Sequence, residues 1–268
     1  MEFRDTAVWI TGASSGIGEA LAKALARRGA KLILSARREA ELARVSDEIA
    51  AMGIAAERIA VLPFDVTDED ALDAAVGSAE AAFGRVDVLI NNAGISQRSL
   101  ALDTDMAVYR RIMEVDFFAP VALTQKMLPR MVAQGGGHIA VTSSIAGKVG
   151  VQLRTAYCAA KHAVMGYYDA LRAEVAQHNI GVTTIVPGFI RTDIARHALR
   201  GDATEKGEDS PSIAGGMDPD RAAAVILRGM ERGRPEIPVG EGREMSLLTL
   251  KRVAPRAVFR MVEKMQAE

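Results

Sequence analysis

A tyrosine and a lysine stand four residues apart, at Tyr157 and Lys161, in an alanine-rich stretch with the pattern of a helix. Residues at positions i and i+4 of a helix share a face, so the phenol and the ammonium group can converge on one point. A phenol ordinarily titrates near pH ~10, but a fixed positive charge beside it favours the phenolate. Tyr157 is therefore a candidate general acid or base that Lys161 activates. On its own this spacing also fits a core tyrosine beside a surface lysine.

A dinucleotide-binding turn is predicted near the N-terminus, where a buried strand over residues 6–11 leads into a glycine-rich turn and a helical pattern. A strand, a glycine-rich turn and a helix N-terminus together bind a pyrophosphate on backbone N–H groups. Gly12 allows the tight turn, Gly16 lets the backbone approach the phosphate, and Gly18 lets the helix pack on the sheet. The residues predicted to contact the cofactor here are Gly12, Ser14, Ser15, Gly16, Ile17 and Gly18.

Two arginines, Arg37 and Arg38, follow the second predicted strand, where a dinucleotide fold distinguishes a ribose 2′-hydroxyl from a 2′-phosphate. An acidic side chain binds the hydroxyl, whereas an arginine accommodates the phosphate. Because residues 35–38 include no Asp or Glu, NADP(H) is favoured over NAD(H). The alternative is that the arginines only begin a solvated helix over residues 39–52.

Three further predicted strands cover residues 59–64, 86–90 and 138–141. Asp65 and Val66 follow the first, where an adenine contact is expected because open α/β sheets bind ligands at the carboxyl ends of their strands. Asp65 can equally cap the next helix. The second leads into Asn92, Ala93 and Gly94, which provide hydrogen bonds and close backbone approach. Ser144 follows the third and can fold back over Tyr157, or it can simply form a turn or a helix cap.

Strands and helices alternate along the whole chain, which predicts an α/β fold: a single Rossmann-like, doubly wound parallel sheet of about seven strands with helices on both faces. A long helical pattern over residues 106–134 is interrupted by Pro120 and Pro129. The last two strands are expected at residues 181–186 and 236–240. Residues 1–268 contain no internal repeat and no linker, so we expect one domain.

The composition excludes several classes of protein. The formal net charge of −1 argues against a nucleic-acid binder. A single cysteine, Cys158, excludes an intrachain disulfide and a cysteine-cluster metal site, and the four histidines lack ligand spacing, so no metal is expected. No apolar run approaches the ~18–20 residues of a membrane span, and the predicted first strand leaves no signal peptide. We therefore expect a cytoplasmic protein.

Taken together, these motifs resemble the NAD(P)-dependent short-chain dehydrogenase/reductase family. The matching motifs, in family order and spacing, are Thr11-Gly12-x-x-x-Gly16-Ile17-Gly18, Asn91-Asn92-Ala93-Gly94, Ser144, Tyr157-x-x-x-Lys161 and Pro187-Gly188. The resemblance covers about residues 5 to 192. Residues 34–38 and 143–148 look most like family members that act on steroid, retinoid-like or other lipophilic carbonyls.

The resemblance implies a role for each site residue in the interconversion of a secondary alcohol and a carbonyl. Ser144 would hydrogen-bond the substrate oxygen, Tyr157 would transfer a proton to or from it, and Lys161 would activate Tyr157 and bind the nicotinamide ribose. Hydride would pass between the substrate carbon and the nicotinamide. Further cofactor contacts are implied for Pro187 and Gly188, and for Ile190 and Thr192 at the carboxamide. The resemblance also implies a homodimer or a homotetramer.

One position departs from the family pattern. Where the family usually has an asparagine that organises a water beside the lysine, this chain has Asp116. A carboxylate still accepts hydrogen bonds from such a water, but it adds a negative charge and loses the amide donor. Our hypothesis is that Asp116 keeps the proton relay and alters its pH dependence; the alternative is a purely structural role.

The C-terminal third has weaker signals. Residues 193–218 are polar and glycine-rich and are expected to form a mobile substrate lid. Residues 245–268 read as an amphipathic helical tail with interleaved lysines and arginines. Such a helix can lie on a membrane surface, but we expect it to pack on its own domain or on a partner subunit. A non-catalytic dinucleotide-binding redox sensor is the competing function, and an intact Tyr157 and Lys161 argue against it.

Overall fold

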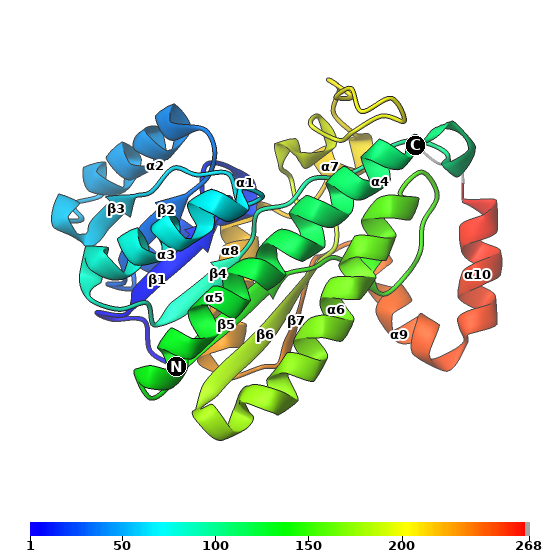
Figure 1. Ribbon diagram of the computed structural model, residues 1–268. Helices are drawn as coiled ribbons and strands as arrows, with labels where there is room; N and C mark the ends of the chain where they lie inside the picture. The colour runs from blue at the N-terminus through cyan, green and yellow to red at the C-terminus, as the bar shows by residue number, and fades with distance from the viewer. Residues whose placement is uncertain (266–268) are drawn as a thin grey trace.

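All strands of the protein lie in one parallel sheet, as a computed structural model that describes residues 1–265 shows (Figure 1). The strand order is β3-β2-β1-β4-β5-β6-β7, so β2 and β3 lie on one side of β1 and β4 to β7 lie on the other. The strands are β1 Ala7–Thr11, β2 Lys31–Ser35, β3 Ile59–Val61, β4 Val88–Asn91, β5 Gly137–Thr142, β6 Ile180–Pro187 and β7 Glu236–Val239. The predicted seven-stranded, doubly wound sheet is therefore confirmed.

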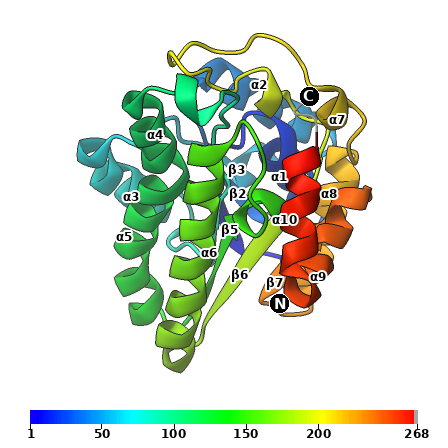
Figure 2. The ribbon, with the colours of Figure 1, turned by 90° about the vertical axis from the view of Figure 1, so that its right-hand side faces the viewer.

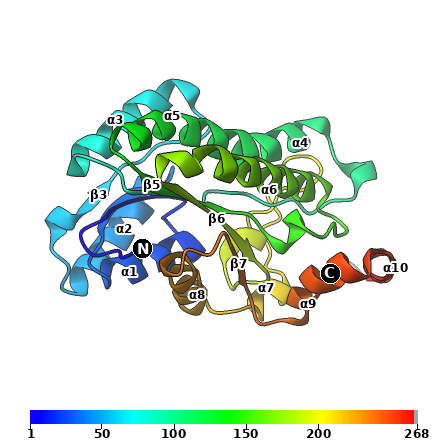
Figure 3. The same ribbon diagram turned by 90° about the horizontal axis from the view of Figure 1, so that it is seen from below.

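Helices cover both faces of the sheet, as the view from below shows (Figure 3). One core lies between the sheet and α1, α2 and α8, and a second lies between the sheet and α3, α5 and α6. Both cores combine apolar side chains of the strands with those of the covering helices. The central strands are buried on both faces, which is why they read as continuous apolar runs. The helices are α1 Gly16–Ala26, α2 Glu39–Ala51, α3 Glu69–Phe83, α4 Met106–Met113, α5 Ala119–Ala133, α6 Thr155–Val175, α7 Pro211–Ala214, α8 Pro219–Glu231, α9 Ser246–Val253 and α10 Pro255–Lys264.

The third strand is shorter than predicted. It ends at Val61 rather than at Phe64, although the backbone N–H groups of Leu62 and Phe64 still donate to the chain of β2. Pro63 lies between them, at a position whose N–H group would point to the open edge of the sheet, so the proline removes no hydrogen bond to β2. The remaining predicted strands differ from the observed ones by one or two residues.

The helical stretch over residues 106–134 is not interrupted at its prolines. A π-helical turn, Glu114–Phe118, joins α4 to α5 instead. Pro120 follows the π turn directly, as the second residue of α5, and α5 continues through Pro129. A π turn has one residue more than an α-helical turn, so it changes the rotation of α5 relative to α4. Asp116 lies within this turn.

Segment 193–218 contains little regular structure: a 3-10 turn, Asp193–Ala195, and the single-turn helix α7. It lies at the end of the molecule where α6 begins (Figure 1). Its role as a lid stays a prediction.

The C-terminal tail consists of two helices instead of the one amphipathic stretch expected. Pro255 lacks an N–H group and forces Ala254 out of the helical region, to φ −137°, so α9 ends and α10 begins there. Val258 is buried, whereas Phe259 and Met261 are about half exposed, and the two helices extend from the side of β7 (Figure 2). The last part of the predicted tail, residues 266–268, lies outside the described residues. No helix within residues 1–265 is long and apolar enough to cross a membrane.

Candidate active site

Gly12, in the turn between β1 and α1, and Gly18, in the first turn of α1, lie where no side chain fits. Gly12 adopts φ +65°, and a Cβ atom there would lie 2.8 Å from Cα of Ala93. A Cβ atom on Gly18 would lie 2.1 Å from the carbonyl oxygen of Gly12. Ser15, the N-cap residue of α1, makes no side-chain capping hydrogen bond, so the first N–H groups of the helix face outward without a side-chain acceptor. This cradle has the shape and polarity that a pyrophosphate requires.

Gly16 brings the far end of the site to the same turn. It adopts φ +57°, and a Cβ atom there would lie 2.9 Å from Cγ2 of Thr192. Thr192 follows β6 and is 176 residues further along the chain (192 − 16). Ile190 is buried beside it and pairs with Met217 in an isolated β-bridge. Gly16, predicted to contact the pyrophosphate, and Thr192, predicted to contact the carboxamide, therefore lie side by side and line the same pocket.

Asn92 joins the carboxyl ends of three strands. Its backbone N–H and that of Ala93 donate to the Thr11 hydroxyl at 3.0 and 3.1 Å. Its amide group donates to the carbonyl oxygens of Thr11 and Gly12 at 3.3 Å. On the other side, the Thr142 hydroxyl donates to Asn92 Oδ1 at 3.1 Å. The residues after β4 thus fix the glycine turn relative to the end of β5, which Ser144 follows.

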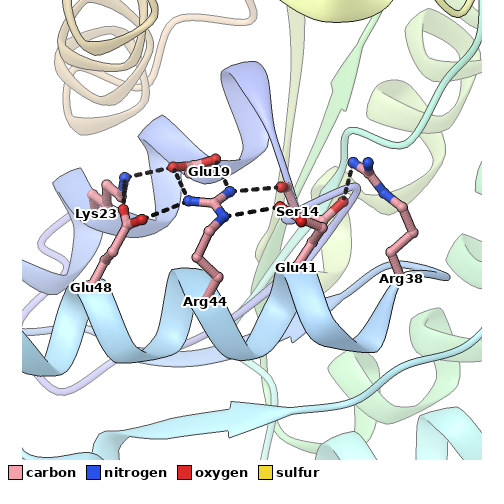
Figure 4. A network of polar contacts seen from close by, with 7 residues as sticks. All are labelled: Ser14, Glu19, Lys23, Arg38, Glu41, Arg44 and Glu48. Carbon is pink, nitrogen blue, oxygen red and sulfur yellow. Dashed lines mark hydrogen bonds and ion pairs between the residues drawn. The ribbon is translucent and has the colours of Figure 1, made fainter.

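An arginine that the sequence reading passed over, Arg44, supports the glycine turn from α2 (Figure 4). Its guanidinium pairs with Glu19 at 2.8 Å, Glu41 at 2.9 Å and Glu48 at 2.7 Å, and donates to the carbonyl oxygen of Ser14 at 3.3 Å. Its spacing from two glutamates, at i−3 and i+4 of one helix, was the signal available in the sequence. Arg44 is neutralised by these partners, so it holds the turn in place instead of offering free charge.

Arg38 approaches the same turn with its charge available. Its Nη2 atom lies 3.5 Å from the Ser14 hydroxyl (Figure 4), and its side chain is exposed. Arg37 is exposed next to it. No acidic residue follows β2 before Glu39, the first residue of α2. An anionic group placed over Ser14 would therefore meet at least one unpaired guanidinium.

Asp65 and Val66 lie beside this region. Asp65 accepts hydrogen bonds from the backbone N–H and the hydroxyl of Thr67, at 2.9 and 2.8 Å. It does not cap α3, because Asp68 is the N-cap residue of that helix and accepts a backbone hydrogen bond in its first turn. Val66 borders a small cavity that Ala93 also lines. The alternative role considered for Asp65 is thus taken by Asp68.

Lys161 is buried against Tyr157 on one face of α6. Its Nζ atom lies 5.6 Å from the centre of the Tyr157 ring, and the exposed fractions of the two residues are 4% and 6%. The ammonium group donates to the carbonyl oxygen of Thr142 at 3.0 Å and lies 3.6 Å from Oδ2 of Asp116. A lysine is almost never this deeply buried unless its charge is paired. The alternative of a core tyrosine beside a surface lysine is therefore excluded.

Asp116 is fully buried and only half satisfied. Its Oδ1 atom accepts a hydrogen bond from the backbone N–H of Ile95 at 2.8 Å. Among residues 1–265, no group is placed to hydrogen-bond Oδ2. Burial raises the pKa of this carboxyl, and the nearby Lys161 ammonium opposes the rise. A Cβ atom on Gly94 would lie 3.1 Å from Oδ1 of Asp116 and 3.3 Å from Nζ of Lys161, so a side chain at position 94 would crowd the pair.

Ser144 follows β5 at the start of a short 3-10 turn. Its hydroxyl accepts from the backbone N–H of Ala146 at 3.1 Å, which is the cap considered in the sequence, and its proton remains free to be donated. The turn is seated on α6: the Ser143 hydroxyl donates to the Lys161 carbonyl at 3.1 Å, and a Cβ atom on Gly147 would lie 2.7 Å from that carbonyl oxygen. Ala146 packs with Tyr157 in one buried cluster.

The turn after β6 is held by a second residue that the sequence reading missed. The carboxylate of Glu244 accepts from the backbone N–H of Phe189 at 3.3 Å. A Cβ atom on Gly188 would lie 2.6 Å from Oε1 of Glu244 and 2.7 Å from Sδ of Met245. Pro187 is the last residue of β6, and its position at the strand end fixes where the turn begins.

The predicted site residues therefore border one region, at the carboxyl ends of β1, β4, β5 and β6. It offers a glycine-rich turn at a helix N-terminus, two exposed guanidiniums and a phenol beside a buried ammonium. Among residues 1–265, no three His, Cys, Asp or Glu side chains are grouped so that they could hold a metal ion.

Residues 6–202 match the protein family described as short chain dehydrogenase. The chain belongs to this family. It is 38% identical over 262 residues to the dehydrogenase/reductase SDR family member 7B of Bos taurus, covering 97% of this chain and 81% of that protein. It is 40% identical over 258 residues to the dehydrogenase/reductase SDR family protein 7-like of Drosophila melanogaster, covering 96% and 79%.

Solved structures of short-chain dehydrogenases share the fold. One from Burkholderia phymatum, in complex with NAD, has a TM-score of 0.84 at 23% identity and covers 100% of this chain and 99% of its own. One from Burkholderia cenocepacia, in complex with NADP, has a TM-score of 0.81 at 22% identity and covers 99% and 100%. Family membership makes the protein an oxidoreductase of the dehydrogenase/reductase type that binds NAD(P).

Proposed function

We propose that the protein interconverts a secondary alcohol and a carbonyl with NADP(H), and that Tyr157 is its general acid/base. The observation that carries the proposal is the buried ammonium of Lys161 against the Tyr157 ring, at 5.6 Å from the ring centre. In a site that excludes water, this charge stabilises a phenolate far more than it would at the surface. Of this pair, the Tyr157 hydroxyl is the group that can give a proton to a substrate oxygen and take it back.

The proton follows a short route in this proposal. In the reductive direction, Tyr157 donates its phenolic proton to the substrate oxygen, to which Ser144 also donates a hydrogen bond. Lys161 stabilises the phenolate that remains and passes a proton to it, and Asp116, beside Lys161, returns a proton to the lysine. In the oxidative direction each transfer is reversed. The nicotinamide supplies or accepts the hydride.

The cofactor would lie along the carboxyl ends of the strands. The cradle of Gly12, Gly16 and Gly18 fits the pyrophosphate, because each Cβ atom missing there would collide with the surrounding backbone or side chain. Arg38, within reach of Ser14, and Arg37 beside it would bind the 2′-phosphate, which supports NADP(H) over NAD(H). The remaining contacts would come from Asp65, Val66, Asn92, Ala93, Gly94, Pro187, Gly188, Ile190 and Thr192.

The test is a comparison of Tyr157→Phe with the wild type. NADPH and NADH are first titrated in a thermal-shift assay, where the shift follows RT ln(1 + [L]/Kd). Carbonyl reduction is then screened with steroid, retinoid-like and other lipophilic ketones and aldehydes, the class that the resemblance suggests. We expect Tyr157→Phe to keep the NADPH shift and to lose at least about 1000-fold in turnover, the loss expected when a general acid is removed from an activated site. A wild type that binds coenzyme but turns over no carbonyl or alcohol would favour a redox sensor instead.

A cytoplasmic location and a homodimer or homotetramer stay predictions from the composition and from the family resemblance. Size-exclusion chromatography with light scattering measures the second directly.

A further inference from the structure

Gln97 is a fully buried polar residue outside the family motifs, and every part of its amide group is bonded. Its Oε1 atom accepts from the backbone N–H of Ala156 at 2.7 Å. Its Nε2 atom donates to the hydroxyls of Ser99 and Thr104 at 3.1 and 3.2 Å. Because a backbone N–H can only donate, the oxygen must face Ala156, which fixes the orientation of the amide.

The bond to Ala156 caps the helix that carries the catalytic tyrosine. The first N–H groups of a helix have no partner within it. Arg154, the N-cap residue of α6, makes no side-chain capping hydrogen bond. Gln97 supplies the missing acceptor from 59 residues earlier in the chain, and it does so at the residue immediately before Tyr157.

The loop in front of α6 is strained, and the same segment holds it. Leu153 adopts φ +62°, in the left-handed region that a branched side chain rarely enters. Such a conformation persists only where its surroundings fix it. The backbone N–H of Ser99 donates to the Leu153 carbonyl at 3.1 Å. Segment 97–99 therefore holds both the strained loop and the start of α6.

On its other side, segment 96–98 is tied to the predicted lid. Gln97 and Leu199 form an isolated parallel bridge. The backbone N–H of Leu199 donates to the Ser96 carbonyl, and that of Arg98 donates to the Leu199 carbonyl, both at 2.8 Å. The Leu199 side chain packs against the small cluster that contains Ala156. One short stretch of backbone thus joins residues of the lid to the first turn of α6.

We propose that Gln97 is a positioning residue that couples the placement of Tyr157 to the closure of residues 196–207, the part of the predicted lid that contains Leu199. When this segment lies against residues 96–98, Gln97 caps α6 and the phenol points into the site. When the segment moves away, the bridge to Leu199 opens, the cap is released and the start of α6 loosens. The proton donor is then in place only over an enclosed substrate. The catalytic meaning of this coupling rests on the proposed function, but the coupling itself does not.

Amide hydrogen exchange of the apo and the NADPH-bound protein tests the coupling without any turnover. Gln97→Met keeps the length of the side chain and removes all three hydrogen bonds. We expect about tenfold faster exchange at residues 156–158 and also at residues 198–201, because local opening at both places becomes easier. Faster exchange confined to residues 97–104 would overturn the proposal. If Gln97→Met does not fold, Gln97→Asn makes the same test, since its amide is one methylene too short to reach Ala156.

Two control variants separate the coupling from general destabilisation. Thr104→Val removes one acceptor of the Gln97 amide and leaves the cap intact, so exchange at residues 156–158 should stay within about twofold of the wild type. Gln177→Met makes the same chemical change at an exposed position beyond the other end of α6. An equal loss of protection at residues 156–158 in either control would contradict a specific role of Gln97.

Kinetics with the best carbonyl compound from the screen provide the second readout. We expect kcat of Gln97→Met to fall at least about tenfold while the thermal shift given by NADPH is unchanged, because the phenol is displaced and the coenzyme turn is not. An unchanged kcat would overturn the positioning role. A wild type without any turnover would refute the proposed function alone, because the exchange measurement would still decide the coupling.

Discussion

The ammonium nitrogen of Lys161 and the Oδ2 atom of Asp116 lie 3.6 Å apart in a fully buried position, and Oδ2 has no hydrogen-bond donor among residues 1–265. A buried carboxyl with one free oxygen is costly as an anion, and the neighbouring cation only partly offsets that cost. This arrangement makes the properties of Asp116 measurable through stability as well as through activity.

Asp116→Asn should stabilise the protein increasingly as the pH rises. Burial raises the pKa of the Asp116 carboxyl in the folded state, so its favourable contribution is complete below its unfolded pKa of 3.8 and is lost as the pH rises through the folded pKa. The groups facing it are the Lys161 ammonium of α6 and the backbone N–H of Ile95. In urea unfolding between pH 4.5 and 8.5, the variant should gain up to ~1.4 kcal/mol per pH unit within the window of the shift.

The same variant tests the proposed proton relay. If Asp116 exchanges protons with Lys161, the pH–rate profile of Asp116→Asn should be displaced from that of the wild type with the melt of the coenzyme complex unchanged. A pH-independent stability difference together with an unchanged profile would show that the carboxylate is ionised throughout and has a structural role only.

Arg38→Ala should weaken NADPH binding by about 10- to 100-fold, because a charge-assisted hydrogen bond to a phosphate is worth about 1.5–3 kcal/mol. NADH has no 2′-phosphate, so its affinity should change less than about twofold. Isothermal titration with both coenzymes measures the difference. Arg232→Ala, at an exposed position after α8, is the control for loss of one positive charge. Equal losses for both coenzymes would move the phosphate contact away from Arg38.

Gly147→Ala should destabilise the protein by about 1–3 kcal/mol, the usual cost of inserting a methyl group where no space exists. Its Cβ atom would lie 2.6 Å from the Ser143 hydroxyl and 2.7 Å from the Lys161 carbonyl oxygen. Gly150→Ala is the matched control, because nothing lies within 4 Å of its Cβ position. Urea denaturation at pH 7.5 distinguishes them. Similar stabilities of the two variants would show that the turn can move off α6 at little cost.

Acid should destabilise the fold through His138 at the start of β5. Its pKa is lowered to about 4, chiefly by burial, and its Nε2 atom lies 3.0 Å from the Thr183 hydroxyl, which itself donates to the Arg234 carbonyl. The unfolded chain therefore binds a proton first, and up to ~3 kcal/mol of stability is lost as the pH falls from 6.5 to 4. His138→Leu should flatten this part of the stability profile. His178→Gln, an exchange at an exposed histidine, should leave it unchanged.

The parts of the site that could be predicted are those fixed by local spacing. The glycine turn depends on residues within one strand–turn–helix unit, and Tyr157 and Lys161 share a helix face because they are four residues apart. The strands were recognisable because a sheet covered on both faces needs uninterrupted apolar runs. A predicted boundary was wrong where a single proline decides it, as Pro255 does between α9 and α10.

The supporting residues could not be predicted, because their partners are distant in the chain. Glu244 reaches the turn after β6 across 55 residues, Arg44 reaches Ser14 across 30, and Gln97 reaches Ala156 across 59. Nothing in the periodicity of a single sequence marks such pairs. The π turn is equally hidden, since the apolar pattern of residues 106–134 also fits an unbroken α-helix.

Because of this π turn, the geometry of the site depends on the number of residues between α4 and α5 as well as on their identity. Asp116 faces Lys161 from within the turn, while Thr124, further along in α5, hydrogen-bonds Asn91 and Tyr168 in the core. In a regular helix each residue adds about 100° of rotation. Deleting one residue from Glu114–Phe118 would therefore place either Asp116 or Thr124 on the wrong side. No single substitution elsewhere in the helix would restore the relative orientation of Asp116 and Thr124 after such a deletion.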